Sequence, residues 1–304
     1  MNYTQFKKEV SDEISSRLGS NYTITIQQIN KNNGVSYDGM IIRNNNYNIS
    51  PTFYLNPYYH RYLEGVKIED IYDDILKAYE RHMPKQNYNI EDFMDFEKAK
   101  SQIIFRLVNY EKNLRLLESV PHIKFHDMVI LFQYAVSDFN DQCATILIRN
   151  EHMECWKTDT DELYRLAIDN TPKMRGIVFT HLNDIVNQMM IANPFSQDTR
   201  DCPMYVLSNS IYTSGASVIL YKGLLNDISE RLHSNFIIIP SSVDEVIILA
   251  IDDYDDYTDV LDYFSSMVKE VNQSHLADDC VLSDNAYVYI RTTGQIIMSH
   301  NSII

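Results

Sequence analysis

Hydrophobic residues in the first part of the chain change from a helical to a strand period. Apolar side chains recur every four positions from Phe6 to Leu18, which predicts an amphipathic helix over residues 3–18. Asn33-Gly34 then separates two extended runs, and Asn-Gly is a strong hairpin signal because both residues accept positive φ. With a second turn at residues 44–46, the segment 22–55 is predicted to form a three-stranded meander.

A helical pattern returns after the meander. Asn56-Pro57 is typical of a helix start, with Asn as N-cap and Pro at the first helical position. Apolar positions continue through residues 58–82, with a break at Gly65, and stop before Met83-Pro84. We therefore predict an N-terminal α-β-β-β-α subdomain over residues 1–84.

Strand and helix patterns alternate in the remainder, residues 91–304, and predict a larger α/β subdomain. The expected strands cover residues 103–108, 127–136, 144–148, 204–208, 216–221, 236–239 and 245–251, with a turn at 137–141 and a last hairpin around Thr293-Gly294. The expected helices cover residues 91–100, a segment reaching Trp156, a segment opened by a capping box at 158–162, then 224–232 and 257–271. This order predicts an α+β (mixed α/β) protein with two β-sheet subdomains and packed helices.

Two segments of the larger subdomain resemble each other. Residues 144–148 and 216–220 align at an offset of 72, and each is followed by a helical pattern. One interpretation is an internal β-β-α repeat over about 128–156 and 204–232. The other is that any two segments made of a hairpin and a helix look alike, and the sequence leaves both open.

Short phrases spread over nearly the whole chain carry a family resemblance. They are Lys31-Asn-Asn-Gly34-Val35, Asn48-Ile-Ser-Pro51-Thr52 with Tyr54-Leu55 and Tyr58, Phe105-Arg106-Leu107-Val108-Asn109, Val120-Pro-His122, Ala144-Thr-Ile-Leu147, Glu162-Leu163-Tyr164, Asn170-Thr-Pro172, Tyr205-Val-Leu-Ser208-Asn209, Gly215-Ala216, Ser229-Glu230, Pro240-Ser-Ser-Val-Asp-Glu245-Val246 and Leu282-Ser-Asp284. In this order they resemble an uncharacterised family from Firmicutes, a domain of unknown function, over about residues 4–290. The resemblance implies one recurrent unit and brings no activity or catalytic residues with it.

Charge is distributed unevenly along the chain. The 304 residues include 42 acidic and 26 basic side chains, which gives a net charge of −16. Residues 244–284 contain twelve acidic residues and one basic residue, Lys269, so this segment carries 11 of those charges. Direct binding to nucleic acid is not expected there, because such binding depends on Lys and Arg neutralising phosphates. The rest of the chain is near neutral.

Motifs of several common enzyme classes are missing from the sequence. It has no G-x-S-x-G nucleophile elbow, no phosphate-binding P-loop, no G-x-G-x-x-G finger and no CxxC pair. No cofactor is therefore expected. The N-terminus carries charges where a signal peptide has its apolar core, and no apolar run approaches the roughly 20 residues of a membrane span. We expect a cytoplasmic protein without a membrane partner.

His122 and His126 form a motif that suggests a metal. On a helix, two imidazoles four residues apart face one way and can share an ion, with Asp127 as a further ligand. The alternative is a junction between a loop and a strand after Pro121, where the two rings need not meet.

Two clusters are candidates for a partner-binding surface. Tyr59, Arg61 and Tyr62 lie in one helical segment, and Tyr and Arg are frequent in interface hot spots, although Tyr on a helix packed against a sheet is more often part of the core. The second cluster is acidic and precedes or opens the last helix, where helix capping is the simpler explanation. Its members are Asp252, Asp253, Asp255, Asp256, Asp259 and Asp262.

The function expected from these patterns is that of a non-enzymatic intracellular protein-binding or regulatory protein. Its partner would be another protein, and the oligomeric state is left open. The alternative is a metal-dependent hydrolase that uses His122 and His126 with nearby carboxylates.

Overall fold

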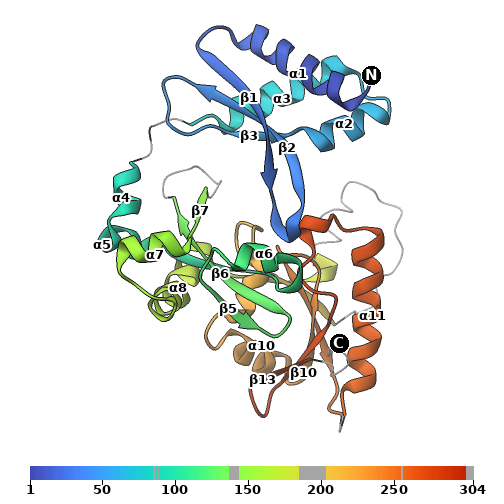
Figure 1. Ribbon diagram of the computed structural model, residues 1–304. Coiled ribbons are helices and arrows are strands. Elements are labelled where there is room, and N and C mark those ends of the chain that lie inside the picture. Colours follow the sequence, from blue (N-terminus) through green and yellow to red (C-terminus); the bar gives the residue numbers. More distant parts are fainter. Residues whose placement is uncertain (85–86, 88, 137–143, 185–202, 255, 299–304) are drawn as a thin grey trace. The chain divides into compact units, whose positions relative to one another are not determined.

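Two units, Met1–Glu91 and Asp92–Ile304, make up the chain in the computed structural model (Figure 1). The structure describes residues 1–84, 87, 89–136, 144–184, 203–254 and 256–298. Helices and antiparallel sheets occur in both units, so the predicted α+β class is confirmed.

The first unit follows the order expected from the hydrophobic pattern. Its elements are α1 (Tyr3–Leu18), β1 (Tyr22–Asn30), η1 (Asn32–Gly34), β2 (Ser36–Asn44), β3 (Thr52–Tyr54), α2 (Leu55–Leu63) and α3 (Ile68–His82). The strands form an antiparallel sheet in the order β1-β2-β3. Asn33 and Gly34 have φ of 58° and 71°, which is the positive φ that the hairpin prediction requires.

The core of the first unit joins its helices to one face of the sheet. Phe6, Met40 and Ile75, from α1, β2 and α3, are all fully buried in it. The predicted cap at Asn56 was wrong: α2 begins at Leu55 with Tyr54 as N-cap. Asn56 instead accepts a hydrogen bond of 2.9 Å from the Asp38 amide, so its side chain serves β2 rather than the helix.

The second unit begins with helices and a small sheet. Its elements up to residue 175 are α4 (Ile90–Met94), α5 (Phe96–Ala99), η2 (Lys100–Gln102), β4 (Ile103–Asn109), η3 (Glu111–Asn113), α6 (Leu114–Leu117), β5 (His122–Phe125), β6 (Met128–Ala135), β7 (Thr145–Leu147), α7 (Asn150–Trp156) and α8 (Thr160–Arg175). The sheet has the order β4-β6-β5, and β7 also pairs with β6. The turn predicted at 137–141 lies outside the described residues.

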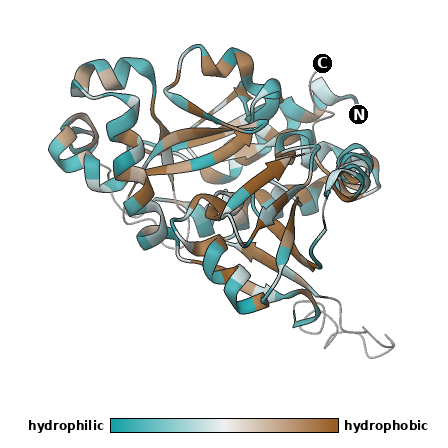
Figure 2. Cartoon of the chain, turned by 90° about the horizontal axis from the view of Figure 1, so that it is seen from below, coloured by the Kyte–Doolittle hydropathy of each residue, from teal (hydrophilic) through white to brown (hydrophobic). Residues whose placement is uncertain are grey.

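A six-stranded antiparallel sheet follows in the same unit. Its elements are β8 (Val178–His181), β9 (Met204–Ser208), η4 (Gly215–Leu220), α10 (Leu224–Leu232), β10 (Asn235–Pro240), β11 (Val246–Ile251), α11 (Thr258–Ser274), η5 (Asp278–Cys280), β12 (Tyr287–Ile290) and β13 (Gln295–Met298). The strand order is β13-β12-β10-β11-β9-β8. Figure 2 shows that the strands are mainly hydrophobic and the outer turns of the helices mainly hydrophilic. Among the described helices, none is long and apolar enough to cross a membrane.

The strand predicted over residues 216–221 is instead the 3-10 helix η4. Its neighbour β9 already pairs with β11 on one side and with β8 on the other, so no open edge is left for another strand there. In the proposed β-β-α repeat, the first copy has β7 as its second strand, whereas the second copy has the 3-10 helix η4 at the corresponding position. The two copies therefore differ in their second element. A short apolar run does not distinguish these two conformations.

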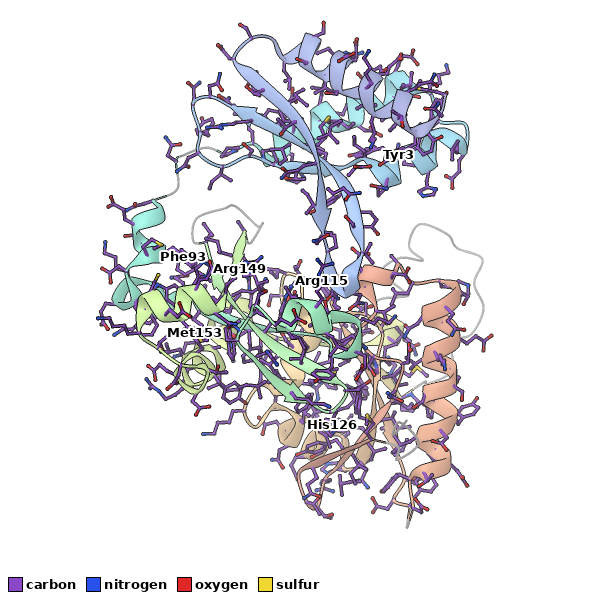
Figure 3. All side chains as sticks on the ribbon, viewed as in Figure 1. Tyr3, Phe93, Arg115, His126, Arg149 and Met153 are labelled. Carbon is purple, nitrogen blue, oxygen red and sulfur yellow. The ribbon has the colours of Figure 1, made fainter. Side chains whose placement is uncertain are left out.

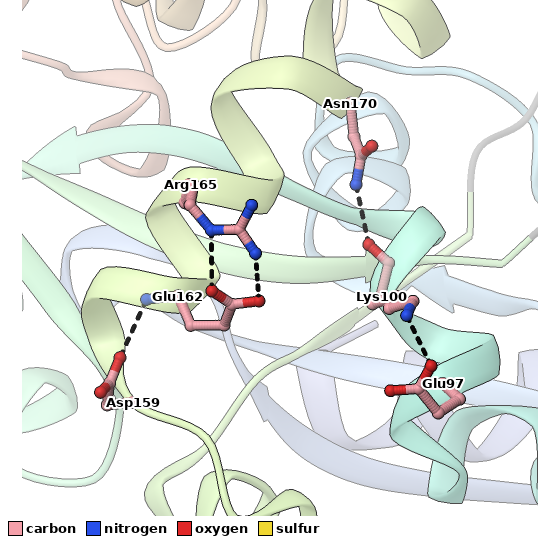
Figure 4. Close-up of polar contacts among 6 residues, drawn as sticks. All are labelled: Glu97, Lys100, Asp159, Glu162, Arg165 and Asn170. Carbon is pink, nitrogen blue, oxygen red and sulfur yellow. Dashed lines mark hydrogen bonds and ion pairs between the residues drawn. The ribbon is translucent and has the colours of Figure 1, made fainter.

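Helix α8 covers the free edge of β4. The Asn170 side chain donates to the carbonyls of Lys100 and Ile103, at 2.9 and 3.0 Å, and the first of these bonds is drawn in Figure 4. The Phe105 amide donates to the Thr171 hydroxyl at 3.1 Å. Side chains of a helix thereby satisfy the Ile103 carbonyl and the Phe105 amide at the edge of β4, which holds this part of α8 beside the strand.

Candidate functional site

A pocket of about 120 Å³ lies beside β4 in the second unit. Its lining comes from four places: Ile104, Phe105 and Arg106 of β4; Gln133 and Thr145 of the neighbouring strands; Thr171 and Arg175 of α8; and Asn209, Thr213, Ser214 and Ser217 of the β9–η4 loop and η4. Among the described residues, this lining contains two arginines and seven uncharged polar residues but no acidic residue. The pocket is therefore a positively charged and polar space.

Arg106 is a single charged residue in an otherwise apolar strand. Its neighbours along the same face of the sheet are Ile104 and Val108, and Leu131 lies directly opposite it on β6. Burial lowers the pKa of the Arg106 guanidinium, because the surrounding side chains remove water from it. Its Nε atom is enclosed and has no hydrogen-bond partner. No acidic side chain of the described residues forms an ion pair with it.

Arg175 enters the pocket from the last turn of α8. It continues the buried stripe of that helix, four residues after Thr171, and its relative exposure is only 6 %. Its carbonyl accepts a hydrogen bond of 2.8 Å from the Ser210 amide, which ties the helix end to the β9–η4 loop. Within the described parts of the chain, no carboxylate pairs with its guanidinium.

The positive charge of Arg175 acts on the pKa of the Tyr221 phenol, but Tyr221 does not supply a negative charge that would balance it. Burial raises the pKa of its phenol to about 12, and Arg175 offsets only part of this effect. The hydroxyl is therefore neutral at ordinary pH. It is also buried without a hydrogen-bond partner.

The loop between β9 and η4 is held in one conformation by its own contacts. Ser214 has φ of 52°, and its amide donates to the Asp244 carboxylate at 2.7 Å. A Cβ on Gly215 would lie 2.0 Å from the Ser208 hydroxyl and 2.3 Å from the Asp244 carbonyl, so only glycine fits. Asp244 binds the loop from outside the pocket lining and does not pair with either arginine. A rigid loop thus forms the wall opposite β4.

These features define what the pocket can bind. Two guanidinium groups present planar pairs of N–H donors, which match the oxygens of a phosphate or carboxylate. Gln133 is held by its bond of 3.0 Å to the Thr145 hydroxyl, and the Ser and Thr side chains add further polar groups. A volume of about 120 Å³ suits a small oxyanion or the charged end of a larger molecule better than a whole drug-sized ligand, which needs roughly 300 Å³ or more.

Residues 3–291 match the model of a family described as "Family of unknown function (DUF5688)". The chain belongs to this family. The match confirms the resemblance noted over about residues 4–290. It says nothing about an origin in Firmicutes. No curated protein and no solved structure matches the chain. The site of this DUF5688 member is therefore interpreted from its own geometry.

Of the predicted metal ligands, His122 begins the short strand β5 and His126 follows its end, so neither lies on a helix. Because a strand rises about 3.3 Å per residue, four residues separate the two positions by roughly 13 Å. His122 is exposed, and its Nδ1 lies 3.0 Å from the Val120 carbonyl. His126 lies at the β5–β6 turn with φ of 55° and is labelled in Figure 3. Burial lowers its pKa, while Asp127 acts in the opposite direction.

Asp127, the further ligand considered for that metal, is engaged in a hydrogen-bond network. Its carboxylate accepts bonds from Ser283 at 2.7 Å, from Asn285 at 2.9 Å and from the Tyr287 hydroxyl. Among the described residues, no group of three or more His, Cys, Asp or Glu side chains could hold a metal ion. The metal-dependent hydrolase therefore stays a prediction, and no set of metal ligands among the described residues supports it.

The aromatic cluster of α2 packs into the first unit. The Tyr59 ring contacts those of Tyr3 and Phe6, and its hydroxyl donates to the Met1 carbonyl. Tyr62 also packs on Phe6, and Arg61 pairs with Asp74 at 2.7 Å. These contacts favour the core interpretation of the cluster, and a partner-binding role for it stays a prediction.

The acidic cluster lies before and along α11. Asp256 accepts bonds from the amide and hydroxyl of Thr258, at 2.9 and 2.7 Å, and these bonds hold the pKa of its carboxyl below its usual range. Asp253 accepts a bond of 2.6 Å from Asn235. Two of the six carboxylates thus have structural roles, while Asp252 and Asp259 are exposed. Asp255 lies outside the described residues.

Sequence reasoning missed the pocket, although two signals pointed to it. The first is a lone arginine within the apolar run Ile103–Val108. The second is Arg175, which falls at the next four-residue step after Leu163, Ala167 and Thr171 on the buried face of α8. Each arginine breaks the binary pattern of its element, and such breaks are expected at functional sites.

Proposed function

We propose that this protein is a binding or regulatory protein whose ligand is a small oxyanion, held between Arg106 and Arg175. The observation that supports the proposal is that the partly buried Arg106 and the buried Arg175 line one pocket, and no carboxylate of the described residues pairs with either. A cytoplasmic location belongs to the same proposal. Within the described residues, the exposed Cys155 is a free thiol, as is usual inside cells.

The physical argument begins with the cost of an unpaired buried charge. Arginine stays protonated in proteins, so burial leaves it charged and poorly solvated rather than neutral. Buried charges are therefore normally paired, and an uncompensated one destabilises the folded state by several kcal/mol. An anion in the pocket would supply the missing partner for both guanidiniums. Anion binding is therefore favourable because it removes the destabilisation that the unpaired guanidiniums cause in the ligand-free protein.

The pocket favours binding over catalysis. In the part of the chain that the structure describes, its lining has hydroxyl groups but no His, Asp, Glu, Cys or Lys that could serve as a general base or a strong nucleophile. Ser217, one of those hydroxyls, donates to the Ser214 carbonyl at 2.7 Å. We therefore assign the pocket the role of a ligand sensor or carrier site.

Inorganic phosphate tests this proposal directly. We expect phosphate to raise the melting temperature of the wild-type protein when chloride keeps the ionic strength constant. At a concentration about 100 times the Kd, the stabilisation would be about 2.7 kcal/mol. Acetate, titrated in the same way, shows whether a carboxylate is accepted as well. Differential scanning fluorimetry measures the shift, and isothermal titration calorimetry gives the Kd.

Matched variants separate this pocket from general anion effects. Arg106→Met and Arg175→Met should each abolish the phosphate-induced shift. Arg165→Met is the control, because Arg165 lies on the same helix, is 68 % exposed at its side chain and pairs with Glu162 on the surface. In the absence of phosphate, Arg106→Met should raise stability by up to about 1 kcal/mol, because it removes an unpaired, partly buried charge. A wild-type protein indifferent to both anions, or an Arg165→Met variant as insensitive as the other two, would refute the proposal.

A further inference from the structure

The outer face of α11 presents large apolar side chains to solvent. Tyr263, Met267 and Val271 have relative exposures of 63 %, 45 % and 50 %. They are spaced four residues apart in a helix of 17 residues, so they form one ridge along its surface. Single exposed apolar residues are common, but a contiguous row of three is typical of an interaction surface.

These side chains are not needed to attach the helix to its sheet. The inner face of α11 does this through Leu261 and Val268, which are 2 % and 4 % exposed. Leu261 packs in a core cluster with Ile237 and Val288, from β10 and β12. In Figure 1, α11 runs along one side of the second unit. The ridge is therefore available without any loss of packing.

Two exposed acidic side chains, Asp259 and Glu270, flank the ridge. Asp259 lies one helical turn before Tyr263, and Glu270 lies three residues after Met267; both are exposed. Lys269 is the one basic residue of α11. The surface therefore combines an apolar ridge with a negative border, within a segment that carries 11 of the 16 net negative charges of the chain.

We infer that the outer face of α11 docks a basic amphipathic helix of a partner protein. Like charges disfavour three other occupants: nucleic acid, an anionic membrane surface and a second copy of the same face. A helix with an apolar stripe and flanking Lys or Arg matches both the ridge and its border. This surface is separate from the pocket, so the inference goes beyond the proposed anion binding.

A labelled synthetic peptide serves as the probe. It has about 18 residues of Leu and Lys, arranged so that one helical face is apolar, and its matched control has the same composition in an order without such a face. We expect the wild-type protein to bind the first peptide in a fluorescence-polarisation titration and to bind the second about tenfold more weakly or not at all. Raising the salt concentration should weaken the binding without abolishing it.

Variants of the full chain assign the binding to α11. The triple change Tyr263→Ser, Met267→Ser and Val271→Ser should weaken binding about tenfold or more, and Met267→Ser alone guards against a folding defect in the triple variant. Asp259→Asn with Glu270→Gln should reduce the salt dependence. Leu63→Ser, at a 61 % exposed apolar position of the first unit, is the control. Equal binding of both peptides, unchanged binding by the triple variant, or binding to anionic vesicles instead of the peptide would overturn the inference.

Discussion

At the scale of single residues, two partly buried charges of the second unit, Asp127 and Arg106, differ in their hydrogen-bond partners. The Asp127 carboxylate receives three hydrogen bonds, from Ser283, Asn285 and Tyr287. The Arg106 guanidinium has no ion-pair partner among the described residues, and its Nε has no hydrogen-bond partner. A satisfied network stabilises a fold, whereas an unsatisfied buried donor costs stability and needs another explanation. This contrast is the reason to interpret Asp127 as structural and Arg106 as a ligand-binding residue.

Tyr287→Phe tests the structural role of the Asp127 network. Burial and the neighbouring Asp127 charge raise the pKa of the Tyr287 phenol well above its usual range, so the hydroxyl remains a donor. Its removal leaves one oxygen of the carboxylate without that bond, and we expect a loss of about 1–3 kcal/mol in urea denaturation. Tyr289→Phe on the same strand is the control, with an expected change below about 0.5 kcal/mol. Equal effects of the two changes would contradict the network's importance.

His126 makes the stability of the protein depend on pH. Its pKa is lowered in the folded state, so below about pH 6.5 the unfolded chain binds a proton that the folded chain does not. Stability therefore falls as the pH drops from about 6.5 toward the folded-state pKa, and rises again with pH. His126→Asn should reduce this dependence, since Asn tolerates the positive φ at this position.

Urea denaturation at mildly acidic and neutral pH measures the effect of His126→Asn. The relevant quantity is the difference in unfolding free energy between the two pH values, because loss of the ring contacts with Phe125 and Tyr287 lowers stability at both. His122→Asn, at an exposed position on the same strand, is the matched control. If the pH dependence in His126→Asn equals that of the wild type, the half-buried His126 imidazole does not set it.

At the scale of elements, period and turn chemistry predicted most of the fold. The helices over residues 3–18 and 224–232 have the predicted bounds, and the Asn33-Gly34 hairpin has the predicted positive φ values. These elements are specified locally, by their own amphipathic pattern or by the conformations that their turn residues accept. Their sequence therefore carries the information needed to predict them.

Other elements depend on partners that the sequence does not reveal. Residues 215–220 have a strand-like composition, but they form η4 because both edges of β9 are occupied and Gly215 packs against Ser208 and Asp244. The pocket likewise needs β4, α8 and a loop after β9, which lie up to about a hundred residues apart in the sequence. Single charges in apolar runs show that something unusual occurs in each element. Only the fold shows that both arginines meet in one place.

At the scale of the whole molecule, each unit contains its own hydrophobic core. The core of the first unit is formed by residues between Tyr3 and Met83, from α1 through the end of α3. In the second unit, one cluster lies around Leu131 and another around Ile237. None of these clusters draws residues from both units. Each unit therefore has the apolar interior that independent folding requires.

The last prediction follows from these separate cores and from the location of the pocket. Because all pocket-lining residues lie between Ile104 and Ser217, a fragment of residues 92–304 should fold and show the same phosphate-induced rise in melting temperature as the full chain. Fragment 1–91 should unfold cooperatively and show no such rise. Scanning fluorimetry and circular dichroism on the two fragments check both statements. The lining residues of the pocket all lie in the second unit, so phosphate binding is expected there alone. A fragment 92–304 that folds but no longer responds to phosphate would instead mean that the first unit contributes to binding.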